Sequence, residues 1–392
     1  MKILYYSPHP QLSMYAPTGY GTHIREMIAA WRRMDIEVRT FIAGDLDQGE
    51  YQSAENTGKG KFGTAKKLIP GFVWQSLRDF SLMRFDREQQ KILESQIEIF
   101  KPDIIYERVA YLQNSGIRTA QRYGIKHIAE INAPYPEERI SFSGDSFFLA
   151  KARKMEREIL IHSNGISVVS SALKKYLSKI LPEAESKILV VPNSVNPASA
   201  ELSLEKNEKL RVDYNIDNEI VVGFVGSMFP YHGVDVLIKA FAKIPEEKNV
   251  RLLIVGDGAI LPDLKALAKS LNVFQKVIFT GSLPHREVYA NIELMDICCM
   301  PKSNWYGSPV KIFEYGLLQK PVIAPNEVPM HDVMGADDGE LVEPNVNDFY
   351  AAMMKLISDE TRRKLIAANW HQKVMQNYTW DAAAKKTLTL CI

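Results

Sequence analysis

The chain has 392 residues, of which 46% are hydrophobic, and a formal net charge of +1. This length indicates two domains, and the balanced charge argues against a dedicated nucleic-acid binder, which usually carries a marked basic excess. Three cysteines without metal-ligand spacing exclude a disulfide framework, and no apolar run reaches the roughly 18 residues of a membrane-spanning helix. We therefore expect a cytoplasmic protein, either soluble or at the inner face of a membrane.

The first 195 residues alternate short apolar runs with helical patterns. Helices are expected at about 22–34, before residue 100 and at 147–161. Strands are expected at 2–6, 38–42, 104–106, 127–131, 166–169 and 188–191. This alternation predicts a parallel sheet with helices on both faces, whose ligands gather at the carboxyl ends of the strands.

Several polar or glycine residues follow the strand ends of this first domain. Gly19 and Tyr20 open the turn before the first helix, where backbone N–H groups could seat a phosphate, although ordinary turn chemistry is the alternative. His23 lies in the first helical turn and is either a surface residue or a group of the ligand crevice. Arg108 and Glu130 end two strands and are expected to point to that same crevice.

The segment 45–68 is polar and glycine-rich. Its Asp45 and Asp47 are interpreted as a solvated acidic turn, so no metal site is predicted. The next stretch, KKLIPGFVWQSLRDFSLMRF, mixes cations with aromatic residues. It has two interpretations: peripheral contact with an anionic membrane surface, or a helix over the acceptor side of the crevice.

A polar linker at 196–218 separates a second alternating pattern. Its strands are expected at 219–225, 250–255, 277–280, 297–300 and 322–324. The sequence thus predicts two doubly wound domains, 1–195 and 219–379, with a final helix at about 380–392 that crosses back to the first domain.

The stretch GSPVKIFEYG, from Gly307 to Gly316, joins two of these strands. Ser308 is predicted to cap a helix that starts with Pro309, so that the free N–H groups of its first turn can bind a phosphate. Lys311 and Glu314, three residues apart, are expected together on the face turned away from the sheet. A sugar diol would then supply hydrogen-bond donors to the Glu314 carboxylate.

Several segments occur in the order and spacing of a known family. VVPNSVN, VGSMFPYHGVDVLIKAF, IVGDG, FTGSLP and GSPVKIFEYG resemble motifs in the second halves of family 4 retaining glycosyltransferases. PTGYGTHIREM and EINAPYPEE are similar to first-half motifs of that family. The resemblance implies an α/β GT-B fold, in which two Rossmann-like domains face each other across a cleft.

The resemblance also implies an activity. It is the metal-independent transfer of a sugar, with retention, from a nucleotide diphosphate sugar to a hydroxyl of a glycan, lipid-linked or small-molecule acceptor in glycan, polysaccharide or glycolipid synthesis. No cofactor and no nucleic-acid partner are implied. Lys311 would face the diphosphate, Glu314 the ribose, and Arg108 and His23 would complete the catalytic set. The implied donor-binding residues are Gly19, Tyr20, Gly226, Ser227, His232, Gly256, Gly281, Ser282, Leu283, Tyr306, Gly307, Ser308, Pro309, Val310, Lys311 and Glu314.

The chain departs from the family pattern at four of these positions. Tyr306 replaces an earlier glutamate that contacts the donor sugar, and Ser227 and His232 replace an arginine and a lysine beside the diphosphate. Arg108 replaces a histidine near the transferred sugar and either orients a substrate or forms an ordinary salt bridge. A nucleotide-sugar epimerase, a phosphorylase and a non-catalytic sugar-nucleotide-binding member are the alternatives that share this architecture. A dehydrogenase is disfavoured because neither glycine turn completes GxGxxG.

Overall fold

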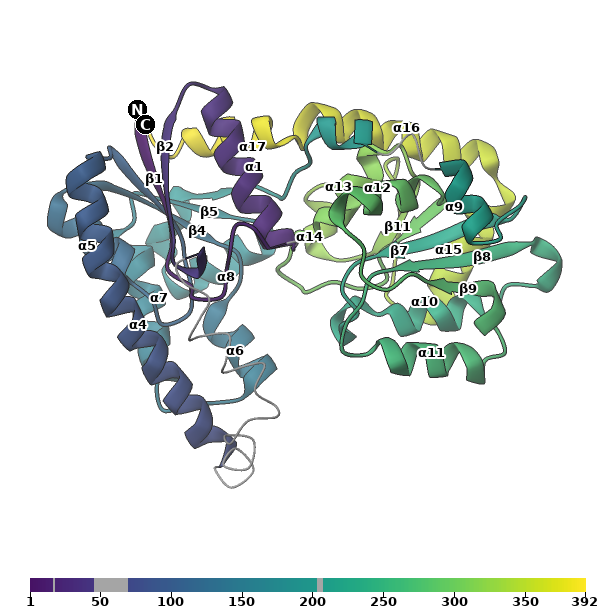
Figure 1. Cartoon of the computed structure of the whole chain (residues 1–392), viewed down its shortest axis with the longest axis horizontal. Coiled ribbons are helices and arrows are strands. Elements are labelled where there is room, and N and C mark those ends of the chain that lie inside the picture. Colours follow the sequence, from purple (N-terminus) through teal and green to yellow (C-terminus); the bar gives the residue numbers. More distant parts are fainter. Residues whose placement is uncertain (17, 46–69, 203–206) are drawn as a thin grey trace. The chain divides into compact units, whose positions relative to one another are not determined.

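The computed structural model describes residues 1–16, 18–45, 70–202 and 207–392, which form two compact units (Figure 1). Met1–Val191 and Ala383–Ile392 make up the first unit, and Pro192–Ala382 the second. Each unit has one six-stranded sheet whose neighbouring strands pair in parallel. The α/β class with two parallel-sheet domains, expected from the sequence, is confirmed.

The first sheet has the strand order β2-β1-β3-β4-β5-β6. The strands are β1 (Lys2–Ser7), β2 (Glu37–Ile42), β3 (Ile104–Arg108), β4 (Lys126–Ile131), β5 (Gly165–Val168) and β6 (Ile188–Val190). The helices are α1 (Gly19–Arg33), α4 (Gly71–Phe100), α5 (Ser115–Tyr123), α6 (Tyr135–Ser143), α7 (Leu149–His162) and α8 (Ser171–Ile180), with 3-10 turns η1 (Ala43–Asp45) and η2 (Pro182–Lys187). The order reverses between β1 and β3, where a doubly wound sheet usually binds its ligand.

Alternate side chains of β1 enter different layers, as the two-residue period of a strand requires. Leu4 and Tyr6 pack with residues of α4 and α5 on one face. Tyr5 lies on the other face, where its ring contacts Trp31 of α1. Helix α17 (Trp380–Leu388) runs beside α1 (Figure 1). The Trp31 indole N–H of α1 donates to the Ala384 carbonyl of α17 over 3.3 Å.

The second sheet has the order β12-β11-β10-β7-β8-β9 and reverses between β7 and β10. The strands are β7 (Ile220–Val225), β8 (Val250–Val255), β9 (Val277–Phe279), β10 (Ile297–Cys299), β11 (Val322–Pro325) and β12 (Glu340–Val342). The helices are α9 (Asn207–Asp213), α10 (Val234–Phe241), α11 (Leu261–Ser270), α12 (His285–Glu293), α13 (Val310–Leu317), α14 (Val328–His331), α15 (Val346–Ser358) and α16 (Glu360–Asn377), with 3-10 turns η3 (Pro197–Leu202), η4 (Pro230–His232), η5 (Glu246–Lys248) and η6 (Phe274–Lys276).

Helices cover both faces of this second sheet (Figure 1). Residues of α10, α11 and α15 form the core on one side, and residues of α12, α13 and α16 form it on the other. Strand β12 was not expected from the sequence because its residues are only half-buried and lack a strong apolar run.

The segment 196–218, expected as a linker, belongs to the second unit. Ala200, Leu210 and Tyr214 pack against its core. The sequence did not indicate these contacts, because the segment around them is mostly polar. The division of the chain falls after Val191, compared with the expected boundary at residue 195. Among the helices of the described residues, none combines the length and apolar character needed to cross a membrane.

Candidate functional site

Three glycines bring the carboxyl ends of β7, β8 and β9 close together. Gly226 and Gly256 have φ angles of +146° and +129°, which L side chains rarely adopt, and a Cβ at Gly256 would overlap the Gly226 carbonyl. The Gly256 N–H donates to the Gly281 carbonyl over 3.0 Å. The strand ends therefore present bare backbone, which lets a ligand approach closely. Ser282 and Leu283 follow at the same edge.

The start of α13 differs from the prediction. Pro309 is its N-cap and makes no side-chain capping bond, and Val310 is the first helical residue. Ser308 does not cap the helix, because its hydroxyl accepts a hydrogen bond from the Asn193 N–H at 3.0 Å. The predicted cap is therefore wrong, since a residue distant in the sequence takes the hydroxyl. Gly307 precedes Ser308 in the connection from β10.

Lys311 and Glu314 lie inside the protein rather than on an open helix face. Trp370 of α16 packs on α13 and donates to the Ile312 carbonyl over 2.8 Å. Lys311 and Glu314 are 8% and 7% exposed. The prediction that they face outward is thus wrong. A buried cation needs an anion or several hydrogen-bond acceptors to offset its desolvation.

The Lys311 ammonium is placed beside the glycine loop. Its Nζ lies 4.2 Å from the ring centroid of Phe224, and a Cβ at Gly226 would overlap it. Within the part of the chain that the structure describes, Nζ has no hydrogen-bond partner. Burial lowers the pKa of Lys311 to about 7, although the charge of Glu314 acts in the opposite direction. An acceptor bound beside Nζ would therefore satisfy a buried donor and favour its charged form.

His232 is a neutral imidazole in its surroundings. Its Nδ1 lies 2.5 Å from the Ser227 carbonyl oxygen, so Nδ1 holds the proton and donates it. Burial, followed by the charge of Lys311, lowers the pKa of His232 to about 4. The imidazole is therefore neutral near pH 7, and its Nε2 is an acceptor.

Tyr306 is 7% exposed and stands two residues before Ser308. Its hydroxyl accepts a hydrogen bond from the Asn304 amide over 3.2 Å, and its ring contacts Trp305 with the centroids 5.2 Å apart. A neutral phenol thus occupies the position where the resemblance implies a carboxylate.

In the first unit, the predicted residues Arg108 and His23 both contact Glu130, which lies at the end of β4. Arg108 Nη1 pairs with Glu130 Oε1, His23 Nε2 lies 3.1 Å from that oxygen, and the Asn132 amide donates to it over 2.7 Å. Burial would raise the pKa of Glu130, but the charges of His23 and Arg108 outweigh it and hold that pKa well below its usual range. Arg108 is thus in a buried salt bridge, as one of its two interpretations held.

Gly19 and Tyr20 form the start of α1, which begins earlier than the predicted residue 22. Thr18 caps this helix by accepting a hydrogen bond from the Gly21 N–H over 3.4 Å. His23 follows in the second turn and is buried, so the surface interpretation of His23 is wrong.

A cavity of about 330 Å³ lies at the carboxyl ends of β1 and β3, where the first sheet reverses its order. It is lined by polar side chains that the sequence analysis missed, namely His9, Arg78, Asp79, Tyr111, Glu138 and Arg139. Burial, followed by the charges of Arg108 and Arg78, lowers the pKa of His9 to about 4. Because His9 comes two residues after β1, the same strand-end reasoning that found Arg108 could have found it.

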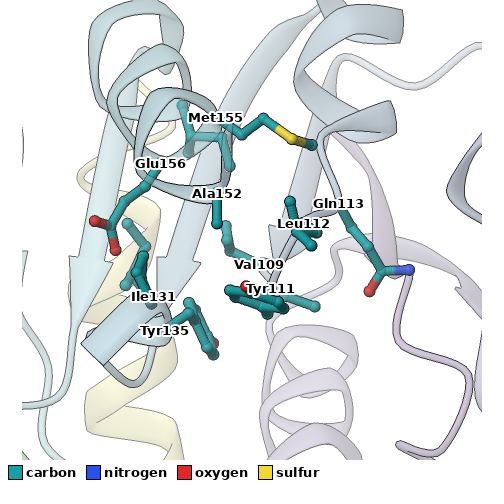
Figure 2. A pocket seen from close by; sticks show the side chains of 12 residues that line it. Val109, Tyr111, Leu112, Gln113, Ile131, Tyr135, Ala152, Met155 and Glu156 are labelled. Atoms are coloured by element: carbon teal, nitrogen blue, oxygen red, sulfur yellow. The ribbon is translucent and has the colours of Figure 1, made fainter. Parts of the chain in front are cut away.

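An apolar pocket adjoins this cavity and shares Val109, Tyr111 and Tyr135 with it (Figure 2). Its volume of about 20 Å³ accommodates roughly one water molecule. Glu156 of α7 lies on its wall and is buried, and neither carboxylate oxygen has a hydrogen-bond partner among the described residues. Burial, followed by the charge of Glu137, raises the pKa of Glu156 to about 8.

Of the acidic turn expected at 45–47, only Asp45 lies within the described residues, where it ends η1 and accepts a hydrogen bond from Ser13. In the described ranges, no group of three His, Cys, Asp or Glu side chains is arranged to hold a metal ion.

Comparison with known proteins agrees with this architecture. The family model described as Glycosyltransferase Family 4 matches residues 17–199, and the one described as Glycosyl transferases group 1 matches residues 206–372. An uncharacterized glycosyltransferase of Methanocaldococcus jannaschii is 28% identical over 240 residues, covering 57% of this chain and 59% of the relative.

Two further proteins extend the comparison. The GDP-mannose-dependent alpha-(1-6)-phosphatidylinositol monomannoside mannosyltransferase of Mycobacterium tuberculosis is 28% identical over 252 residues, covering 61% of this chain and 64% of the relative. The chain thus spans about three fifths of the length of these two curated relatives. The crystal structure of Anabaena HepE in complex with UDP matches with a TM-score of 0.72 and 17% identity over 99% of each chain, so the two share a fold.

Proposed function

Since the chain belongs to the family 4 glycosyltransferases and has their GT-B fold, we propose that it transfers a sugar from a nucleoside diphosphate sugar to an acceptor hydroxyl. The transfer retains the anomeric configuration and needs no metal ion. The resemblance of the sequence motifs to retaining members of the family supports the stereochemistry.

The observation that carries this proposal is the buried Lys311 ammonium. It lies where the second sheet reverses its order, beside the bare backbone of Gly226 and without a hydrogen-bond partner among the described residues. A diphosphate at this place would supply the missing anion and restore the ammonium form. Its negative charge grows as the bond to the sugar breaks, so a fixed cation stabilises the transition state more than the bound donor.

The other residues of the second unit fit the remaining parts of a nucleotide. We assign the backbone of Gly226 and Ser227 to the phosphates, Glu314 to the ribose hydroxyls, and Gly281 to Leu283 to the border of the base. Because His232 is neutral, its Nε2 accepts a hydrogen bond from the donor instead of adding charge. UDP is the first nucleotide to test, since HepE is similar to this chain and was solved with UDP.

We place the acceptor in the first unit, at the cavity where β1 and β3 end. A polar lining suits a glycan or lipid-linked acceptor, and the mycobacterial relative is named for a phosphatidylinositol mannoside acceptor. In this proposal the enzyme works in the cytoplasm, with peripheral contact to the inner face of a membrane through the first unit.

The test is incubation of the purified protein with radiolabelled UDP- and GDP-sugars and a cell extract as the source of acceptor. A labelled product with the anomeric configuration of the donor is expected, with full activity in the presence of a chelator. Epimerised donor or phosphate-dependent cleavage would instead support the two alternative enzyme classes. Nucleotide binding without turnover with any extract would support a non-catalytic member.

Variants locate the site. Lys311→Ala is expected to lower kcat about 100-fold, as loss of one transition-state charge contact does, and Glu314→Ala to weaken nucleotide binding about tenfold. Lys239→Ala is the control, because this exposed lysine of α10 pairs only with Asp235 one turn earlier among the described residues. Parental activity in both site variants would refute the assignment.

A further inference from the structure

In the first half of α4, several apolar side chains are exposed and two polar side chains are buried. Val73, Leu77 and Phe80 lie on one face at helical spacing, and Leu77 and Phe80 are 54% and 59% exposed. Ser76 and Asp79 are buried on the inner face. A helix on a protein surface normally buries its apolar stripe, so an outward stripe marks a contact surface.

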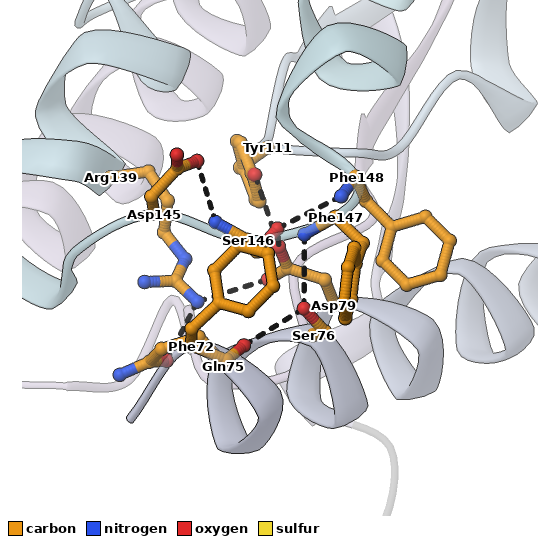
Figure 3. A network of polar contacts seen from close by, with 10 residues as sticks. All are labelled: Phe72, Gln75, Ser76, Asp79, Tyr111, Arg139, Asp145, Ser146, Phe147 and Phe148. Atoms are coloured by element: carbon orange, nitrogen blue, oxygen red, sulfur yellow. Dashed lines mark hydrogen bonds and ion pairs between the residues drawn. The ribbon is translucent and has the colours of Figure 1, made fainter. Parts of the chain in front are cut away.

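A polar network fixes this orientation of α4 (Figure 3). The Asp79 carboxylate accepts hydrogen bonds from the Tyr111 hydroxyl and from Arg139, each over 3.1 Å. The Ser76 hydroxyl accepts a hydrogen bond from the Phe147 N–H over 3.0 Å. Rotation of α4 to bury the stripe would break these bonds and take this acceptor away from Tyr111 and Arg139, which is destabilising.

The same network holds a second set of aromatic side chains outside. Phe147 is 69% exposed, and its ring packs edge-on against Phe72 with the centroids 4.2 Å apart. Phe72, Val73, Leu77, Phe80 and Phe147 together form what we call the apolar patch.

A basic cavity of about 340 Å³ lies between α4, α5 and α7, and its lining on α4 begins at Met83, three residues after Phe80. Its cations are Arg87, Arg118, Lys151 and Lys154, and its carboxylates are Asp86 and Glu158. Arg118 pairs with Asp86 at 3.3 Å, and Lys154 lies 4.0 Å from Glu158. Arg87 and Lys151 form no ion pair with any described residue, so the cavity retains an excess of positive charge.

On both helices, cations that line the cavity follow the exposed aromatic residues of the patch in the sequence. Along α4, Phe80 is followed by Arg87, and Lys151 lies in the first turn of α7, just after Phe147. The two helices are in contact through Met83 and Met155. Apolar side chains that insert below the headgroups, next to cations that meet lipid phosphates, are the arrangement of an interfacial membrane-binding surface.

We propose that the apolar patch and the basic cavity form a docking surface for an anionic lipid bilayer. The patch enters the boundary between headgroups and acyl chains, and the cavity binds a lipid phosphate. Arg78 of α4 also lines the cavity at the ends of β1 and β3. Docking would therefore bring a lipid-linked acceptor to the acceptor site, and this last step rests on the proposed function.

The test is co-sedimentation of the full chain with vesicles of phosphatidylcholine alone or with one quarter phosphatidylglycerol. The parent protein is expected to bind the anionic vesicles, and the double variant Leu77→Asp/Phe80→Asp to bind at least tenfold more weakly, because two apolar side chains leave the interface. Leu365→Asp is the matched control, since Leu365 of α16 is 53% exposed in the second unit and should keep parental binding. Unchanged thermal melting and UDP binding confirm that the variants are folded.

Charge reversal tests the cavity separately. Arg87→Glu/Lys151→Glu should lose the preference for anionic vesicles, whereas the control Lys239→Glu should keep it. Failure of the parent to sediment with either vesicle, or equal binding by Leu77→Asp/Phe80→Asp and Leu365→Asp, overturns the proposal. A concentration-dependent dimer that the double variant abolishes, without vesicle binding, would overturn it in favour of a second copy as the occupant.

Docking and catalysis are separable in these experiments. Vesicle binding without sugar transfer to any acceptor would refute the proposed reaction and leave the docking surface standing. Transfer to a water-soluble acceptor without vesicle binding would refute the docking surface alone.

Discussion

Lys311 and Glu156 are both buried ionisable side chains, and burial shifts their pKa values in opposite directions. The pKa of Lys311 falls to about 7 and that of Glu156 rises to about 8, because in each case the neutral form is cheaper to bury. Near neutral pH each group is therefore close to its own titration point, and a bound ligand can change its protonation.

We predict that UDP binding at pH 8 takes up about one proton, through Lys311. Free Lys311 is mostly neutral at that pH because its pKa is about 7, and the diphosphate would make it charged. Calorimetry in two buffers of different ionisation enthalpy measures the uptake. The proton uptake should vanish in the Lys311→Met variant and persist in the His232→Gln variant. Equal binding enthalpies in both buffers for the parent protein would contradict the placement of the diphosphate beside Lys311.

Glu156 gives a prediction about stability. Its folded pKa of about 8 exceeds the ordinary 4.5, so the folded state holds more protons between these values and stability falls as the pH rises through this window. Glu156→Gln should be near parental at pH 5 and more stable than the parent by about 2–4 kcal/mol at pH 8.5. Urea unfolding at the two pH values measures this, and an equal effect at both would mean that Glu156 does not titrate in that window.

At the scale of single residues, the sequence predicted which side chains matter better than it predicted their surroundings. Lys311 and Glu314 were found because their spacing and neighbouring turn are local features. The burial of Lys311 was missed because Phe224 and Gly226, against which its side chain lies, are far from it in the sequence. Ser308 was misassigned for the same reason, since its partner Asn193 is remote in the sequence.

Among the secondary-structure elements, α13 and α16 are packed unusually close. A Cβ at Gly316 would lie 2.5 Å from Trp370 Nε1 and 2.7 Å from Val374 Cγ2, so the glycine is required by the contact between the two helices.

We predict that Gly316→Ala lowers the free energy of unfolding by about 1–3 kcal/mol through overpacking. UDP affinity should fall as well, because α13 must move away from α16. The control is Gly71→Ala at the start of α4, where a Cβ would meet nothing within 4 Å, and it should change stability by less than about 1 kcal/mol. Chemical denaturation measures both variants, and equal losses would show that α13 and α16 are not in close contact.

Strong apolar periodicity made most elements readable from the sequence, and weak periodicity hid the others. Val250–Val255 was predicted with its exact limits because it is an unbroken apolar run. The half-buried β12 gave no such signal. In the first half of the long helix α4, polar and apolar residues occur on both the buried and the exposed side, so no pattern of the sequence alone indicates which face is buried.

At the scale of the whole molecule, the chain does not divide at a single point. It leaves the first unit after Val191 and returns to it at Ala383, so the first unit is completed only when the last residues are in place. Trp31 connects the two ends, because its indole N–H lies 3.3 Å from both the Ala384 carbonyl and the Thr387 hydroxyl oxygen.

Removal of residues 383–392 is therefore expected to destabilise the first unit while sparing the second. Trp31 would lose its hydrogen-bond acceptors. Gly165, where an added Cβ would lie 3.0 Å from Leu390 Cβ, would also be uncovered. Calorimetry should show one melting transition lowered by several degrees, since a loss of 1–2 kcal/mol shifts a domain of this size by roughly 2–8 °C. UDP should still raise the melting temperature of the other transition by the parental amount, because its proposed contacts on α13 and the glycine loop lie within Pro192–Ala382. A truncated chain in which both transitions fall together would show that the return of α17 stabilises the molecule as one cooperative body rather than completing the first unit.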